Sequence, residues 1–324
     1  MDPQRKRIGT FLLLAFSISW SIAGIGIAMG VTPAKQMGYL VMAGSFMFGP
    51  AIAAIIQQRL IDRGPWRGLG IGFGDVRWGQ VGWSVALGLA IIPLALMVAW
   101  VLGDGLGMEV FGHVSITQER MLVSMEQVTR MAGMESAAVS GPLKDVQLPG
   151  VAWLLVLLAG ALLAACTVNL PAMLGEELGW RGYLYQATAH WSGLRRVVFT
   201  GVVWGLWHAP LIALGHNYPD HPVAGIALMV VFCVLLAVPF DRARQRSGTV
   251  WSAALLHGCI NGSAGAYMLF AWDGATLVNS PVGLAGFIAL ALLTAIILAI
   301  DPVYRAGFLR DTPPMPLPNA QAAE

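Results

Sequence analysis

Long apolar runs decide what this chain can fold into. Eight of them divide the sequence, at about residues 8–30, 38–58, 81–103, 150–174, 195–214, 222–240, 249–271 and 281–301. Each comes close to the roughly 20 residues that a helix needs to cross about 30 Å of hydrocarbon. Lipid offers no partner to a free backbone N–H or C=O, so each run must be helical. The sequence therefore predicts an all-α, polytopic membrane helix bundle with about eight transmembrane helices.

The composition agrees with lipid as the main solvent. The chain is 57% hydrophobic and only 11% charged, whereas a soluble domain carries about 25% charged residues. The net charge of +2 gives no reason to expect nucleic acid as a partner. The first run exceeds the roughly 7–15 apolar residues of a cleavable signal peptide, so we expect it to be retained as a span. We expect a multi-pass protein of the cell membrane with lipids as its surroundings.

The connections between the runs predict the orientation. Basic residues precede the first run and then fill every second connection: Arg5, Lys6, Arg7; Arg59, Arg63, Arg67, Arg77; Arg181, Arg195, Arg196; Arg242, Arg244, Arg246; and Arg305, Arg310. The alternate connections carry very few. Because short cytoplasmic loops are enriched in Lys and Arg, this alternation predicts that both termini lie in the cytoplasm.

We expect one integral membrane domain over residues 1–310. Within the outer segment 104–149, apolar side chains from Met121 to Ala132 recur at helical spacing, which predicts an amphipathic helix. Residues 311–324 contain four prolines and no apolar run, so we expect a disordered tail.

Two adjacent carboxylates, Glu176 and Glu177, end the fourth apolar run. An ionisable residue at membrane depth suggests a functional site. Glu177 and Arg181 are four residues apart, so on a helix they face each other and can form an ion pair. Glu176 points about 100° away and has no such partner nearby in the sequence. We therefore expect Glu177 to be structural and Glu176 to be free to react.

Two histidines interrupt the later runs. His208 follows Trp204 by four residues in the fifth run. His257 and Asn261 are also four apart, so they share one face of the seventh run. Counted from the predicted cytoplasmic ends, Glu176 lies at the end of its run, His257 lies roughly 12 Å deep and His208 lies somewhat deeper. We therefore expect these groups to line one cavity that opens toward the cytoplasm. The alternative is ordinary packing histidines and acids that snorkel from a helix end.

This set of side chains suits the activation of a water molecule. Glu176 would be the general base, His208 would orient the water or share its proton, and His257 with Asn261 would donate hydrogen bonds to an oxyanion. Alternatively, Glu176, His208 and His257 could bind zinc and activate its water. No HExxH sequence supports the zinc version, so no cofactor is certain and zinc stays open.

Three motifs carry a family resemblance: Glu-Glu-x-x-x-Arg at 176–181, aromatic-x-x-x-His at 204–208, and His-x-x-x-Asn at 257–261. Together they resemble the CPBP family of intramembrane proteases, which includes type II CAAX prenyl endopeptidases and bacterial Abi (bacteriocin self-immunity) proteins. The resemblance covers about residues 165–265. The family's second motif usually begins with Phe, whereas this chain has Trp204.

The resemblance implies an intramembrane endopeptidase acting on a peptide or protein at the membrane. It implies catalytic roles for Glu176, Glu177, Arg181, His208, His257 and Asn261, and a place for Trp204 in the substrate pocket. Whether the enzyme is a metalloprotease stays open, and the family's prenylated substrate is not carried over. The competing interpretations are a non-catalytic membrane scaffold or immunity protein and a transporter. A transporter would often show inverted repeats with broken helices in both halves.

Overall fold

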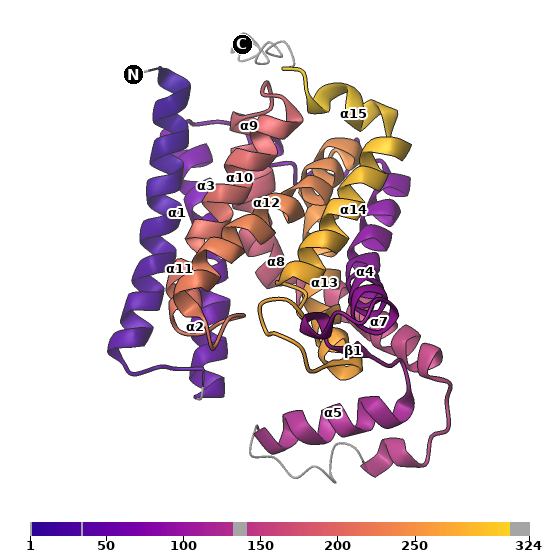
Figure 1. Cartoon of the computed structure of the whole chain (residues 1–324). Helices are drawn as coiled ribbons and strands as arrows, with labels where there is room; N and C mark the ends of the chain where they lie inside the picture. The colour runs from indigo at the N-terminus through magenta and orange to yellow at the C-terminus, as the bar shows by residue number, and fades with distance from the viewer. Residues whose placement is uncertain (1, 34, 132–140, 312–324) are drawn as a thin grey trace.

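The structure, a computed structural model, describes residues 2–33, 35–131 and 141–311, and these are helical almost throughout (Figure 1). The all-α prediction is confirmed. The α-helices are α1 (Pro3–Ala28), α2 (Gln36–Met47), α3 (Gly49–Ile55), α4 (Trp78–Trp100), α5 (Gln118–Met131), α7 (Gly150–Cys166), α8 (Leu170–Glu177), α9 (Tyr185–Ala187), α10 (Gly193–Trp207), α11 (Ala209–Ala213), α12 (Pro222–Ser247), α13 (Val250–Phe270), α14 (Leu284–Ile300) and α15 (Pro302–Phe308).

Short segments of other geometry extend or join these helices. Three are π-helical: η1 (Ile56–Ile61), η3 (Val101–Gly105) and η5 (Leu178–Leu184). Two are 3₁₀ turns: η2 (Trp66–Leu69) and η4 (Glu109–Phe111). The strands β1 (His113–Val114) and β2 (Ala271–Trp272) form a two-stranded antiparallel ladder in which His113 pairs with Trp272.

Four helical stretches are long and apolar enough to cross a membrane: Pro3–Ala28, Gln36–Ile61, Trp78–Gly105 and Pro222–Ser247. Two bent pairs, Gly150–Cys166 with Leu170–Ala187 and Leu284–Ile300 with Pro302–Phe308, raise the number to six if each pair is one span. The predicted runs 195–214 and 249–271 are helical but fall outside this set. The first is split between α10, with 15 residues, and the short α11. A multi-pass membrane protein is confirmed, and the count of eight stays a prediction.

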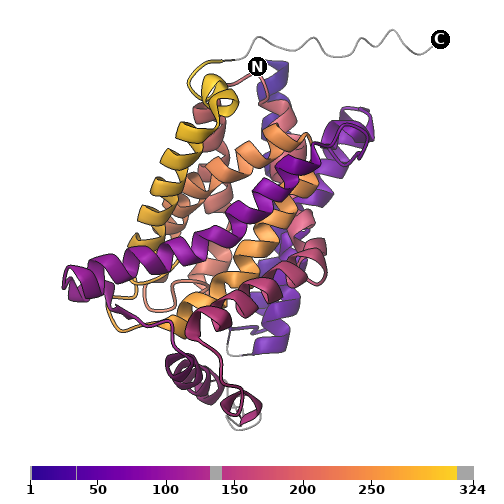
Figure 2. The same cartoon turned by 90° about the vertical axis from the view of Figure 1, so that its right-hand side faces the viewer.

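The helices run side by side in a bundle, and different elements lie at its two ends (Figures 1 and 2). The start of α1, together with α9 and α15, lies at one end, and α5 and β1 lie at the opposite end. The start of α1 and α15 lie at the same end of the bundle (Figure 1), and the orientation of the termini stays a prediction. Which side faces the cytoplasm stays a prediction.

Glycines bring α10 against α12. A Cβ added at Gly201 would lie 2.4 Å from Val234 Cα, and one at Gly205 would lie 2.5 Å from Val230 Cα. Small residues four apart allow helix backbones to approach this closely in membranes. The contact fixes the helix that carries Trp204 and His208.

A second pair of small-residue stripes brings α13 against α7. A Cβ at Gly258 would lie 2.8 Å from Ala165 Cα, and one at Gly262 would lie 2.9 Å from Ala161 Cα. Gly258 directly follows His257 and Gly262 directly follows Asn261 along α13. The close packing therefore sets the depth and rotation of the helix that carries these two side chains.

The amphipathic helix predicted in the outer segment is present as α5. Met121 is buried, while Val123 and Val128 are exposed. Ala132, the last residue of the predicted helix, and the predicted tail from 312 onward lie outside the described residues. The division into one membrane domain, an outer loop and a tail stays a prediction.

Candidate active site

A break in the chain places the two carboxylates within the bundle. α7 and the segment that begins with α8 meet at an angle of 64°. Pro171 lies in the first turn of α8, where a missing N–H costs no helical hydrogen bond. The Asn169 side chain donates to the Gly258 carbonyl at 3.3 Å, which ties the break to α13. After Glu177 the helix widens into η5, a geometry often found at functional sites.

The Glu177 carboxylate is fully buried and is held by two side chains, Arg181 and His257. Arg181 Nη1 lies 3.2 Å from each carboxylate oxygen. His257 Nδ1 lies 3.0 Å from Oε1. The pairing of Glu177 with Arg181 predicted from their spacing is therefore present, through one guanidinium nitrogen.

Arg181 itself packs against two aromatic rings. Its guanidinium carbon lies 4.4 Å from the Trp204 ring centre and 4.3 Å from that of Phe240. Its carbonyl accepts a hydrogen bond from Arg244 Nε at 2.9 Å. Cation–π contacts of this kind are strongest when desolvated, and Arg181 is only 2% exposed.

Glu176 has a different partner from its neighbour. The Trp204 indole N–H donates to Glu176 Oε2 at 2.8 Å, and both residues are 2% exposed. Sequence reasoning missed this bond, because it joins α8 to α10 across 28 positions. We expected Trp204 in a substrate pocket; the structure buries it and directs its polar atom at the carboxylate. A phenylalanine at this position could not make the bond.

Both histidines direct one ring nitrogen at an acceptor. His208 Nδ1 lies 2.8 Å from the Trp204 carbonyl oxygen, and His257 Nδ1 bonds the Glu177 carboxylate. A carbonyl and a carboxylate can only accept, so each Nδ1 carries the proton, and Nε2 holds a lone pair when the ring is neutral. The His208 and His257 ring centres lie 5.9 Å and 5.6 Å from that of Trp204.

Asn261 lies one turn beyond His257 and reaches back to α8. Its amide nitrogen lies 3.4 Å from Met173 Sδ. Asn261 is exposed, whereas His257 is 6% exposed. The structure thus brings together Glu176, Glu177, Arg181, Trp204 and His257, with His208 against Trp204 and Asn261 at the margin.

The arrangement does not fit a metal centre. Within the part of the chain that the structure describes, no three His, Cys, Asp or Glu side chains come together in a way that could hold an ion. Glu176, His208 and His257, the side chains suggested as zinc ligands, therefore form no such set here. We derive no step through a metal.

The comparisons with known proteins cover the same stretch. Residues 150–263 match the family model described as type II CAAX prenyl endopeptidase Rce1-like. The match spans α7 to α13 as far as residue 263, and so it includes every side chain of the site. The resemblance to type II CAAX prenyl endopeptidases is confirmed for this region.

A curated relative agrees with the Rce1-like match. The chain is 41% identical over 44 residues to CAAX prenyl protease 2 of Methanococcus maripaludis. The aligned stretch is 13% of this chain and 16% of the relative, so the chain matches about a sixth of that protein's length. The predicted link to Abi proteins stays a prediction.

Proposed function

We propose that the protein is an intramembrane endopeptidase that hydrolyses a peptide bond of a membrane-associated substrate. One observation carries the proposal: the adjacent acids Glu176 and Glu177 have opposite surroundings. Glu177 is bonded to Arg181 and His257, while the only hydrogen bond to Glu176 from a residue that the structure describes comes from the neutral indole N–H of Trp204. A buried carboxylate without a bonded cation is suited to accept a proton, as a general base must.

The reaction then runs as base-assisted hydrolysis. Glu176 takes a proton from a water, and the resulting hydroxide attacks the carbonyl carbon of the scissile bond. His208, whose Nε2 lone pair is available, orients that water. The tetrahedral oxyanion collapses, the C–N bond breaks, and the proton held by Glu176 passes to the leaving amine. The products are a new carboxylate and a new amine.

The oxyanion needs hydrogen-bond donors. Asn261 Nδ2 is one, and His257 Nε2 is the other in the imidazolium form, whose second proton comes from solvent before the water attacks, since its Nδ1–H already faces Glu177. Glu177 would stabilise the resulting imidazolium, which assigns the structural acid an indirect role. Donors fixed before the reaction stabilise charge as it develops at no cost in reorganisation.

Two features support a substrate at the membrane. The site lies within a bundle of apolar helices, and the curated relative bears the name CAAX prenyl protease 2. By the charge alternation of the connections, the site would open toward the cytoplasmic side. The substrate class of this chain is a peptide with a lipid or transmembrane anchor.

The experiment uses the purified protein in liposomes with two probes, a farnesylated CAAX peptide and an unlipidated transmembrane peptide, in heavy-oxygen water. Cleavage of either should place one heavy oxygen in the new carboxylate. Glu176→Gln should abolish cleavage, and Glu109→Gln, an exposed acid of the outer segment, should not. A Glu176→Gln protein that still cleaves would refute the proposal, and a cellular phenotype that survives this change would favour the non-catalytic scaffold.

A further inference from the structure

Arg181 has hydrogen-bond donors with no partner. Its Nη1 bonds Glu177, but Nη2 is buried without a hydrogen bond to any residue that the structure describes. The Trp204 and Phe240 rings pack against the guanidinium, and Arg181 is only 2% exposed. A guanidinium carries five N–H donors, and a buried one without a partner calls for an explanation such as a bound water.

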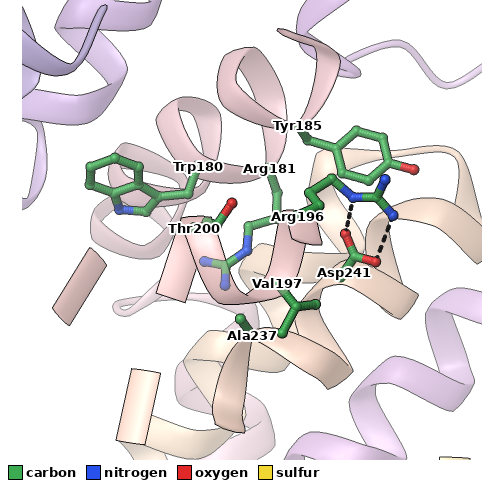
Figure 3. A pocket seen from close by; sticks show the side chains of 8 residues that line it. All are labelled: Trp180, Arg181, Tyr185, Arg196, Val197, Thr200, Ala237 and Asp241. Carbon is green, nitrogen blue, oxygen red and sulfur yellow. Dashed lines mark hydrogen bonds and ion pairs between the residues drawn. The ribbon is translucent and has the colours of Figure 1, made fainter. Parts of the chain in front are cut away.

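A small pocket lies against this side chain (Figure 3). It is lined by Trp180, Arg181, Tyr185, Arg196, Val197, Thr200, Ala237 and Asp241. The space inside is about that of one water molecule.

The other charged groups of the pocket are already satisfied by each other. Arg196 donates through Nε and Nη2 to Asp241 and through Nη1 to the Trp191 carbonyl. Asp241 also accepts from the Tyr304 hydroxyl at 3.0 Å. Because this ion pair is complete, the pocket is not suited to a further anion, and a neutral ligand fits it better.

Thr200 offers a second free polar group. It is 5% exposed and lines the pocket, and its hydroxyl makes no hydrogen bond to a residue that the structure describes, although that oxygen is not fully enclosed. The buried Thr188 differs, because its hydroxyl bonds the Leu184 carbonyl one turn earlier at 2.7 Å. A water in the pocket could accept from Arg181 and bond the Thr200 hydroxyl, giving it the two or more polar partners that a buried water needs.

We propose that this pocket binds one buried water that bridges Arg181 and Thr200 and holds the guanidinium against Glu177. The water completes a chain that runs from Thr200 through Arg181 and Glu177 to His257. Thr200 is a positioning residue in this chain, and it touches neither the substrate nor Glu177. The catalytic part of this inference rests on the proposed function, whereas the water site itself does not.

Radiolytic footprinting tests the water site without any substrate. Ionising radiation converts bound water to hydroxyl radicals that label adjacent side chains, including buried ones. Trp180 lines the pocket, whereas Trp207, whose ring centre is 5.8 Å away, does not, and both are nearly fully buried. Trp180 should be labelled several-fold faster than Trp207, and Ala237→Leu, which fills the pocket, should abolish the difference. Equal labelling of the two tryptophans in the unaltered protein would overturn the water site.

Substitutions at Thr200 test its role on whichever peptide probe is cleaved. Thr200→Val keeps the shape and removes the hydroxyl, so kcat should fall about five- to tenfold with KM unchanged. Thr200→Ser keeps the hydroxyl and should stay within about twofold of the original rate. The matched control is Thr294→Val on α14, whose buried hydroxyl also lacks a partner among the described residues and which should change nothing.

The cleavage rates of the two Thr200 variants, compared with each other and with the unaltered protein, decide the outcome. A serine variant slower than the valine variant would show that Thr200 only fills space, and two variants at the original rate would show that its hydroxyl does nothing; either overturns the positioning role. If no probe is cleaved by the unaltered protein, the proposed function fails, while footprinting still decides the water site.

Discussion

The Trp204→Phe variant should need a higher pH to reach its full rate. The substitution keeps an aromatic ring over Arg181 and removes the indole N–H that donates to Glu176 at 2.8 Å. A hydrogen bond from a donor stabilises the charged form of a carboxylate, and a general base works in that form. Without the bond, Glu176 should lose its proton only at higher pH.

The size of the shift follows from the bond and its surroundings. A hydrogen bond to a charged group contributes about 1.5–3 kcal/mol, and both partners here are 2% exposed, so bulk solvent has little access to replace the lost donor. At about 1.4 kcal/mol per pH unit, the acid limb of kcat/KM should move up by about 1–2 units.

The assay is the pH dependence of peptide cleavage in liposomes, with Trp207→Phe as the matched control. Trp207 lies on the same helix and is equally buried, but its indole nitrogen has no hydrogen bond to a described residue. Its substitution should leave the acid limb in place. An unmoved limb in Trp204→Phe, or equal shifts in both variants, would refute the claim that this bond tunes the base.

Three further predictions follow from the packing and the charges. Arg181→Met should destabilise the protein by about 3–5 kcal/mol in denaturant unfolding from micelles, because it leaves the buried Glu177 charge unpaired; an unchanged midpoint would contradict the ion pair. Gly205→Ala should cost about 1–3 kcal/mol, since its Cβ would meet the Val230 backbone, whereas Gly82→Ala, with open space around it, should not destabilise. Metal analysis of the purified protein should find no stoichiometric zinc, and chelators should not slow cleavage; about one zinc per chain, lost when either site histidine is replaced, would contradict this.

Local helix geometry explains what could be predicted of the site. The pairing of Glu177 with Arg181 and the shared face of His257 and Asn261 each involve residues four apart, and that spacing fixes direction once a helix is assumed. The apolar runs made helices the only choice in lipid. These inferences needed no knowledge of how the helices pack.

What could not be predicted depends on contacts between helices. The bond from Trp204 to Glu176 requires the depth and rotation of α10, which Gly201 and Gly205 set by their approach to α12. The widening at η5 also has no sequence signal that we recognised. Fewer helices are long and apolar enough to span a membrane than the eight runs predicted. The reasons are that α10 has only 15 residues and that α13 carries the polar His257 and Asn261 within its apolar stretch.

The central claim is that two adjacent acids have different tasks, and a comparison of Glu176→Gln with Glu177→Gln tests it most directly. Both variants would be measured for peptide cleavage and for unfolding in the same micelles. The account predicts that Glu176→Gln is inactive but as stable as the unaltered protein, because its amide oxygen can still accept from Trp204. Glu177→Gln should be markedly less stable, because Arg181 loses its counter-ion. An active Glu176→Gln protein, or a Glu177→Gln protein of unchanged stability, would contradict the account.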